Sequence, residues 1–191
     1  MEKHRFAYAS GYYPLAVPDE IIDLIVAEVN NIDFQKFEDS TVGPSGIETV
    51  QSRVRNSKTF WWYEDHWVTS IFSHYFNKAN RDLWEYDLTY LKGIQVTKYE
   101  KGEKYDWHCD YGAEADARHT RKLSATMLIT EPSEFKGGDL EIMDYHGNVI
   151  ATEKTKGTMI IFDSRVPHRV TPVTKGTRIS LVAWMLGPKL R

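Results

Sequence analysis

The sequence predicts a mainly β domain with flanking helices, in which antiparallel strands form a sandwich or barrel. From Leu91 onward, short runs rich in β-branched and aromatic residues alternate with glycine- or proline-containing turns, a pattern typical of antiparallel sheets. Before that point, two stretches repeat apolar residues at helical spacing. Since no flexible linker separates the halves, we expect one domain over residues 1–191, with helical support and the substrate entrance in 1–90 and the β core in 91–191.

The first predicted helix begins just after Pro18. Proline suits the first helical turn, where acidic residues such as Asp19 and Glu20 are also common. The apolar residues expected on one face of this helix are Ile21, Leu24, Ile25 and Val29.

A second helix is predicted over residues 64–79. The apolar residues that recur there at helical spacing are Trp67, Ile71, Phe72, Tyr75 and Phe76. We interpret them as a stripe that faces the core, because such stripes are far more often packing surfaces than cofactor sites.

Five β-rich runs of the C-terminal half are predicted to be strands. These runs are 94–99, 123–130, 140–143, 158–162 and 177–186. Turn residues separate them, for example the pair Gly137 and Gly138 and the pair Lys156 and Gly157.

Composition and charge exclude several classes of protein. A formal net charge of −3 offers no overall attraction for nucleic acid or an anionic membrane. The most apolar helical stretch, 21–29, is too short to span a membrane, and the first residues show no apolar signal segment. The single Cys109 excludes an internal disulfide framework. We therefore expect a soluble, cytoplasmic or otherwise intracellular protein without nucleic-acid or membrane partners; its oligomeric state is not readable.

Three residues form a candidate metal site. His108 and Asp110 are separated by one residue, so on an extended strand both side chains point to the same face. His168 would complete two histidines and one carboxylate, a triad that suits non-haem iron(II) and leaves adjacent coordination positions open. By itself His-x-Asp is a weak motif. A solvated or capping pair for His108 and Asp110, and a hydrogen-bonded loop position for His168, are the alternatives.

Arg178 adds a second feature. It opens the run 178–184, in which alternation places Arg178, Ser180, Val182 and Trp184 on one face. A guanidinium that points into a barrel needs an anion, and the distal carboxylate of a dicarboxylate such as 2-oxoglutarate would supply one. Ser180 or a nearby tyrosine could add a hydroxyl hydrogen bond. A salt bridge from Arg178 to Asp139 or Glu141 remains the structural alternative.

These residues resemble a known family. The segment 95–110 is similar to the metal-binding segment of the prolyl 4-hydroxylase-like 2-oxoglutarate oxygenases, among which the bacterial and phage PKHD-type hydroxylases look closest. Its matching residues are Gln95, Tyr99, Gly102, Tyr105, His108 and Asp110. Further matching segments follow in the same order at 121–124, 135–140, 157–162, 167–174, 178–184 and 187–188.

The resemblance implies a double-stranded β-helix, or jelly-roll, over about 91–186 with N-terminal helices packed on one sheet. It also implies iron ligation by His108, Asp110 and His168, and binding of the distal carboxylate of 2-oxoglutarate by Arg178. Tyr99 would share that carboxylate, and Trp184 would lie beside the co-substrate. Tyr105 and Arg121 are the candidate substrate contacts. Tyr99, Tyr105 and Trp184 could also be plain core residues.

The expected cofactors and co-substrates are Fe(II), 2-oxoglutarate and O₂, with ascorbate as an accessory reductant. The reaction implied is hydroxylation of a prolyl or other residue in a protein or peptide. Hydroxylation of a free amino acid or small metabolite would need the same triad, and a non-enzymatic jelly-roll binding module would not need it. Residues 1–90 and the polar segment 111–122 match the family loosely, so the substrate is the least defined part of this interpretation.

Overall fold

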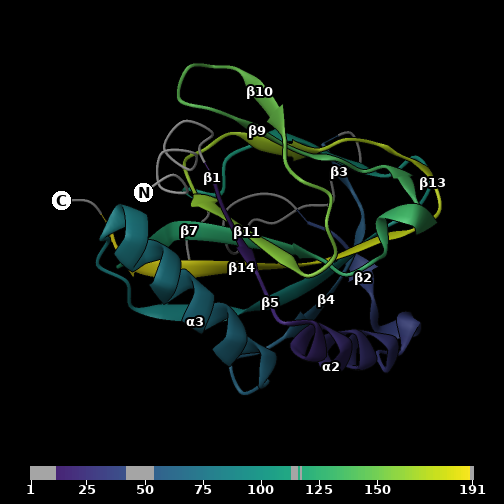
Figure 1. The fold of residues 1–191 in the computed structure, drawn as a ribbon, viewed down its shortest axis with the longest axis horizontal. Coiled ribbons are helices and arrows are strands. Elements are labelled where there is room, and N and C mark those ends of the chain that lie inside the picture. Colours follow the sequence, from purple (N-terminus) through teal and green to yellow (C-terminus); the bar gives the residue numbers. More distant parts are fainter. Residues whose placement is uncertain (1–11, 42–53, 113–115, 117, 190–191) are drawn as a thin grey trace.

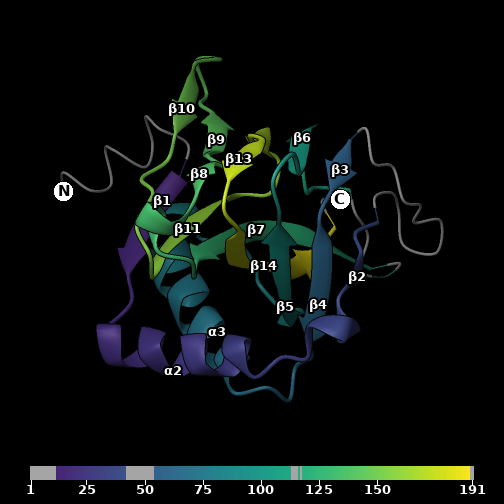
Figure 2. The same cartoon turned by 90° about the vertical axis from the view of Figure 1, so that its right-hand side faces the viewer.

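Two antiparallel sheets and two α-helices form three layers in the computed structural model, which describes residues 12–41, 54–112, 116 and 118–189. The helices α2 (Asp19–Asn30) and α3 (Val68–Ala79) lie beneath the larger sheet, and the smaller sheet lies on its other side (Figure 1, Figure 2). The prediction of a mainly β fold with flanking helices is confirmed.

Within the described ranges, seven strands form the larger sheet. In spatial order they are β1 (Tyr12–Ala16), β11 (Thr158–Asp163), β7 (His119–Leu128), β14 (Arg178–Pro188), β5 (Tyr90–Tyr99), β4 (Lys58–Trp62) and β2 (Glu38–Asp39). The strands predicted at 94–99, 123–130, 158–162 and 177–186 correspond to β5, β7, β11 and β14. Each of these strands has an alternating or continuous apolar run that is long enough for the strand to be recognised from its own sequence.

The smaller sheet of the described chain has five strands. In spatial order they are β10 (Val149–Ala151), β9 (Leu140–Met143), β12 (His168–Val170), β6 (Lys104–His108) and β3 (Arg55–Asn56). The strands β13 (Val173–Lys175) and β8 (Lys136–Gly137) form a separate two-stranded sheet. The described residues also form three short helical turns, η1 (Phe34–Lys36), η2 (Asn80–Trp84) and η3 (Pro132–Glu134). The predicted strand at 140–143 is β9.

The first ninety residues contribute strands as well as helices. β1 pairs with β11 at one side of the larger sheet, and β4 pairs with β5 toward the other. The expectation of helices in this part of the chain was therefore incomplete, because Tyr12–Ala16 and Lys58–Trp62 are short strands whose partners lie far along the chain.

Helix α2 lies where the sequence places it, but its buried face is shifted. Ile22, Ile25 and Val29 are buried, whereas Leu24 is 59% exposed. The prediction for Leu24 was wrong, since it lies about 100° around the helix from Ile25 and so points away from the sheet.

Helix α3 begins four residues later than predicted, at Val68. The preceding segment forms a turn, in which the His66 ring stacks on Trp62 with ring centroids 4.3 Å apart. Trp67 is 39% exposed, and its indole N–H donates to Glu28 Oε1 of α2. Trp67 therefore bridges the two helices at the surface instead of joining the core stripe.

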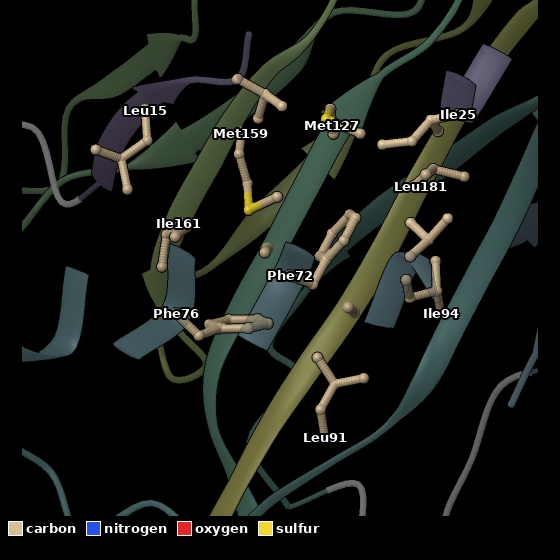
Figure 3. Close-up of a cluster of buried hydrophobic side chains, with 14 of the residues drawn as sticks. Leu15, Ile25, Phe72, Phe76, Leu91, Ile94, Met127, Met159, Ile161 and Leu181 are labelled. Atoms are coloured by element: carbon tan, nitrogen blue, oxygen red, sulfur yellow. The ribbon is translucent and has the colours of Figure 1, made fainter. Parts of the chain in front are cut away.

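The main core lies between the helices and the larger sheet. Phe72 and Phe76 of α3 are fully buried among side chains of the central strands, including Met127, Ile161 and Leu181 (Figure 3). Burial of each large apolar side chain contributes roughly 1.5–3 kcal/mol. In the described ranges, every helix lacks the length and apolarity needed for a bilayer crossing.

Candidate metal centre and its cavity

The candidate metal ligands come together at the smaller sheet. His108 ends β6 and His168 begins β12, and these two residues are direct partners in the antiparallel pairing of the strands. Asp110 Oδ2 lies 3.5 Å from His168 Nε2, and Asp110 Oδ1 lies 3.8 Å from His108 Nε2. One ligand atom from each residue lies within 4.8 Å of the others. The three donors can therefore reach one ion.

Asp110 reaches this position in a different way from the one the sequence suggested. β6 ends at His108, so Asp110 is not a strand residue. Its backbone N–H donates to Ser164 O at 2.9 Å, and its Oδ2 accepts a hydrogen bond from Ser124 Oγ at 2.7 Å. The Ser124 and Ser164 hydroxyls are themselves 2.9 Å apart. Contacts with β7 and the segment after β11 orient the carboxylate.

Both histidines have the tautomer that a metal ligand needs. His108 Nδ1 is 2.8 Å from Asp106 O, and His168 Nδ1 is 3.0 Å from Val166 O. Since a carbonyl oxygen only accepts, each Nδ1 carries the proton and each Nε2 presents its lone pair to the centre.

The charge states of the ligands also fit metal binding. Burial, and next the neighbouring His168, lower the pKa of His108 to about 3, so its imidazole is neutral near pH 7. Burial alone would raise the pKa of Asp110, but His168, Arg121 and His108 outweigh it and hold the pKa well below its usual range. With His168, the neutral His108 imidazole and the Asp110 carboxylate match the two-histidine, one-carboxylate donor set of a facial triad for iron(II).

A cavity of about 440 Å³ adjoins these ligands. The β14 residues Arg178, Ser180, Val182 and Trp184 all line it, as strand alternation predicts. The site residues that the sequence proposed are therefore brought together around one space.

Arg178 is buried in this cavity wall, and no carboxylate of the described residues forms an ion pair with it. It is 4% exposed, and its Nη1 donates to Ser180 Oγ at 2.7 Å. Its Nε has no hydrogen-bond partner in the part of the chain that the structure describes. Asp139 instead pairs with Lys154 at 2.5 Å, and Glu141 pairs with Arg169 at 2.6 Å. The salt bridge considered as an alternative is thus absent between these described residues.

Aromatic residues surround the two ends of the cavity. Tyr99 is the strand partner of Arg178, whose Cζ lies 5.5 Å from the Tyr99 ring centroid. Tyr105 stacks on His108 with ring centroids 3.5 Å apart, and burial raises the pKa of Tyr105 to about 12. The Arg121 guanidinium lies 3.9 Å from the Trp184 ring centroid and 3.6 Å from Asp110 Oδ1. The individual roles of these residues stay predictions.

Sequence reasoning missed three polar residues at this site. Ser124 and Gln95 belong to segments that match the family, but neither was given a role. Arg55 is 7% exposed and lines the same cavity, where its Nη2 donates to Gln95 Oε1 at 2.7 Å. A serine within the apolar run of β7 was a usable signal for Ser124, whereas Arg55 is brought to the site by strand pairing over a long sequence distance.

The polar segment 111–122 contributes Arg121 beside Asp110 but supplies no clustered metal ligand among its described residues. His119 Nδ1 is 2.8 Å from Asp116 Oδ2 and is not one of the clustered ligands. Residues 113–115 and 117 lie outside the described part of the chain.

Residues 94–186 match the family model of the 2OG-Fe(II) oxygenase superfamily. A PKHD-type hydroxylase of Cupriavidus metallidurans is 32% identical over 92 residues, and one of Janthinobacterium sp. is 35% identical over 92 residues. Each alignment covers 46% of this chain and 40% of the relative, so this chain matches less than half of the length of these relatives.

Solved structures share the whole fold at low sequence identity. A Pseudomonas putida prolyl-4-hydroxylase superposes with a TM-score of 0.74 at 20% identity, covering 96% of this chain and 97% of that one. A prolyl hydroxylase from Trichoplax adhaerens gives 0.76 at 18% identity, covering 96% and 86%. These likenesses confirm the jelly-roll architecture. Residues 94–186 are therefore similar in sequence to the 2OG-Fe(II) oxygenase superfamily, and within that range to its PKHD-type hydroxylases.

Proposed function

We propose that this chain is an Fe(II)- and 2-oxoglutarate-dependent dioxygenase that hydroxylates an unactivated C–H bond in a prolyl or other residue of a protein or peptide. One observation carries the proposal: a His–Asp–His cluster faces the same cavity as a buried arginine that has no carboxylate partner within the described ranges. The cluster suits a metal with open positions, and the arginine suits the far end of a dicarboxylate. The proposal treats residues 1–191 as one oxygenase domain.

Different residues would bind the metal and the co-substrate. His108, Asp110 and His168 would hold Fe(II), which when bound supplies the redox chemistry that converts 2-oxoglutarate, O₂ and R–H into succinate, CO₂ and R–OH. Arg178 would bind the distal carboxylate of 2-oxoglutarate through its guanidinium group, with Ser180 and Tyr99 beside it. Tyr105 and Trp184 would exclude water from the metal side of the cavity. Ascorbate remains an expected accessory reductant.

The metal assignment is tested by Asp110→Ala. We expect loss of succinate formation and a fall of at least about 100-fold in Mn(II) affinity, since even second-shell substitutions cost 10- to 100-fold at metal sites. Circular dichroism should show an intact fold. Succinate formation at the wild-type rate by this variant would overturn the triad.

The co-substrate assignment is tested by Arg178→Gln. Loss of a charge-assisted bidentate contact should raise the apparent Kd for 2-oxoglutarate by about 100-fold. Arg81→Gln is the matched control, because Arg81 is an exposed arginine outside the cavity. Unchanged affinity in Arg178→Gln would make Arg178 a structural residue.

The substrate could instead be a free amino acid or small metabolite, and the charged lining of the cavity favours this second candidate. A peptide is supported by the aromatic lining and by the similar Trichoplax adhaerens structure, which was solved with a hypoxia inducible factor peptide fragment. A library of peptides and free amino acids, incubated with Fe(II), 2-oxoglutarate and ascorbate, distinguishes the candidates by mass gain of one oxygen atom.

A further inference from the structure

The cavity has an excess of positive charge. Its described lining contains four cationic side chains, Arg55, Lys92, Arg121 and Arg178, and a single carboxylate, Asp110. A bound Fe(II) and a bound 2-oxoglutarate carry opposite charges of equal size, so the proposed ligands leave this excess unchanged. Lys92 is exposed, but Arg55 is buried and Arg121 is half-buried, and buried cations without anions are costly.

Arg55 has only neutral partners among the described residues. Its Nη2 donates to Gln95 Oε1 at 2.7 Å, and its Nε donates to Ser57 Oγ at 3.2 Å. Its Cζ lies 4.7 Å from the ring centroid of Tyr105, whose phenol is neutral. These contacts fix the guanidinium in place but leave its charge without an anion and its Nη1 without a described hydrogen bond.

Arg121 depends on a carboxylate that has another task. Its Nη1 lies 3.6 Å from Asp110 Oδ1, which is beyond hydrogen-bond length, and no other carboxylate of the described residues lies within ion-pair distance of it. Asp110 is also the proposed metal ligand, so a bound ion would take most of its charge. The Trp184 ring supports the guanidinium from one side, but a cation–π contact supplies only part of what an anion would.

The two guanidinium groups flank the metal site. Arg55 lies against Tyr105, which stacks on His108, while Arg121 lies beside Asp110. Both residues line the same cavity as the three metal ligands, so their guanidinium groups border the space in which an anionic group of the substrate would lie.

We propose that the substrate of this chain carries a carboxylate, which Arg55 and Arg121 bind beside the metal ligands. This inference rests on the proposed function and specifies its substrate class. The carboxylate could belong to a free or N-acylated amino acid or to an acidic side chain of a peptide. A neutral prolyl peptide would leave both guanidinium groups without an anion.

The experiment compares matched acids and amides. Isothermal titration of the Mn(II)- and 2-oxoglutarate-loaded protein would use N-acetyl-L-proline, N-acetyl-L-leucine and their amides, and a set of glutamate-containing peptides with their glutamine counterparts. At least one acid should bind about tenfold or more tightly than its neutral counterpart, since a charge-assisted hydrogen bond is lost in the neutral partner. Preference confined to the N-acetyl amino acids assigns a small substrate, and preference for glutamate peptides assigns a peptide.

The variants locate the effect. Arg55→Gln and Arg121→Gln should each remove the acid preference, and Lys175→Gln should retain it, because Lys175 is an exposed cation outside the cavity. If no acid in the panel binds better than its neutral counterpart, the inference is overturned. Absence of Mn(II) and 2-oxoglutarate binding in the loading step would instead contradict the proposed function, so the two failures are distinguishable.

Discussion

Two neighbouring residues of the metal centre have different charge states for different reasons: burial keeps His108 neutral, and nearby groups keep Asp110 ionised. Burial lowers the pKa of His108 to about 3, while the groups around Asp110 keep that carboxyl ionised despite its burial. A divalent ion would therefore displace no proton from either residue at neutral pH. His108 and Asp110 therefore already have the protonation states that metal binding requires.

Ser124 should act as a positioning residue for Asp110. Its hydroxyl donates to Asp110 Oδ2, so Ser124→Ala should weaken Mn(II) binding about 10- to 100-fold, as second-shell substitutions do. Electron paramagnetic resonance of free Mn(II) measures the affinity directly. Ser124→Thr retains the hydroxyl and should bind Mn(II) as the wild type does. A loss of thermal stability in Ser124→Ala without a change in affinity would assign Ser124 a purely structural role.

At the scale of single elements, β14 joins the site to the core. Ser180 and Val182 face the cavity, whereas Leu181 and Ala183 belong to the core cluster between the larger sheet and the helices. Since successive side chains of a strand point to opposite faces, packing against the helices fixes the positions of the cavity residues.

The helices should contribute stability only through their buried faces. Phe72→Ala in α3 should cost about 3–5 kcal/mol in the free energy of unfolding, because Phe72 is fully buried against the sheet. Leu24→Ala in α2 removes a comparable apolar side chain that is 59% exposed, and should change this energy by less than about 0.5 kcal/mol. Urea denaturation measures both. Equal losses in the two variants would contradict the assigned faces.

An ion-pair network connects the segment after η2 to the end of β11 and predicts a loss of stability in acid. Arg165 binds Asp163 through Nε at 2.9 Å and Nη2 at 2.6 Å, and the Tyr86 hydroxyl also donates to Asp163. Burial alone would raise the pKa of Asp163, but the hydrogen bonds from Arg165 and Tyr86 outweigh it and hold the pKa below its ordinary value of 3.8. Because the folded-state pKa is lowered, this stabilisation is present above pH 3.8 and is lost as the pH falls through the folded-state value.

Asp163→Asn should therefore cost about 2 kcal/mol at pH 7 and flatten the loss of stability below about pH 4. Urea denaturation at several pH values measures both effects. Asp65→Asn, at an exposed aspartate, should leave the acid profile unchanged. An acid profile of Asp163→Asn that matches the wild type would exclude this network as the source of the effect.

At the scale of the whole molecule, the sequence predicted the features that depend on patterns within short segments of the chain. The β14 face from Arg178 to Trp184 follows from alternation within one strand, and the triad follows from a linked series of motifs. Arg55 was not predicted, because it meets Gln95 only through pairings among β3, β4, β5 and β6. The prediction for Trp67 was wrong because the helical spacing of apolar residues extends into the turn before α3. Trp67 lies in that turn, where it stacks with His66 and donates a hydrogen bond to Glu28.

Ligand binding should stabilise the entire chain if the metal and co-substrate bind only the folded state. At ligand concentrations about 100-fold above Kd, the free energy of unfolding should rise by about 2.7 kcal/mol, which raises the Tm of a chain of this size by about 5–10 °C. Differential scanning fluorimetry with Mn(II) and 2-oxoglutarate measures the shift, and excess EDTA should reverse it. Asp110→Ala should show no shift with Mn(II), because Asp110 is the carboxylate of the clustered ligands. A Tm shift of wild-type size in that variant would mean that Mn(II) binds elsewhere. Loss of the Tm shift would link the stability of the fold to the three residues that β6, β12 and the adjoining loop bring together.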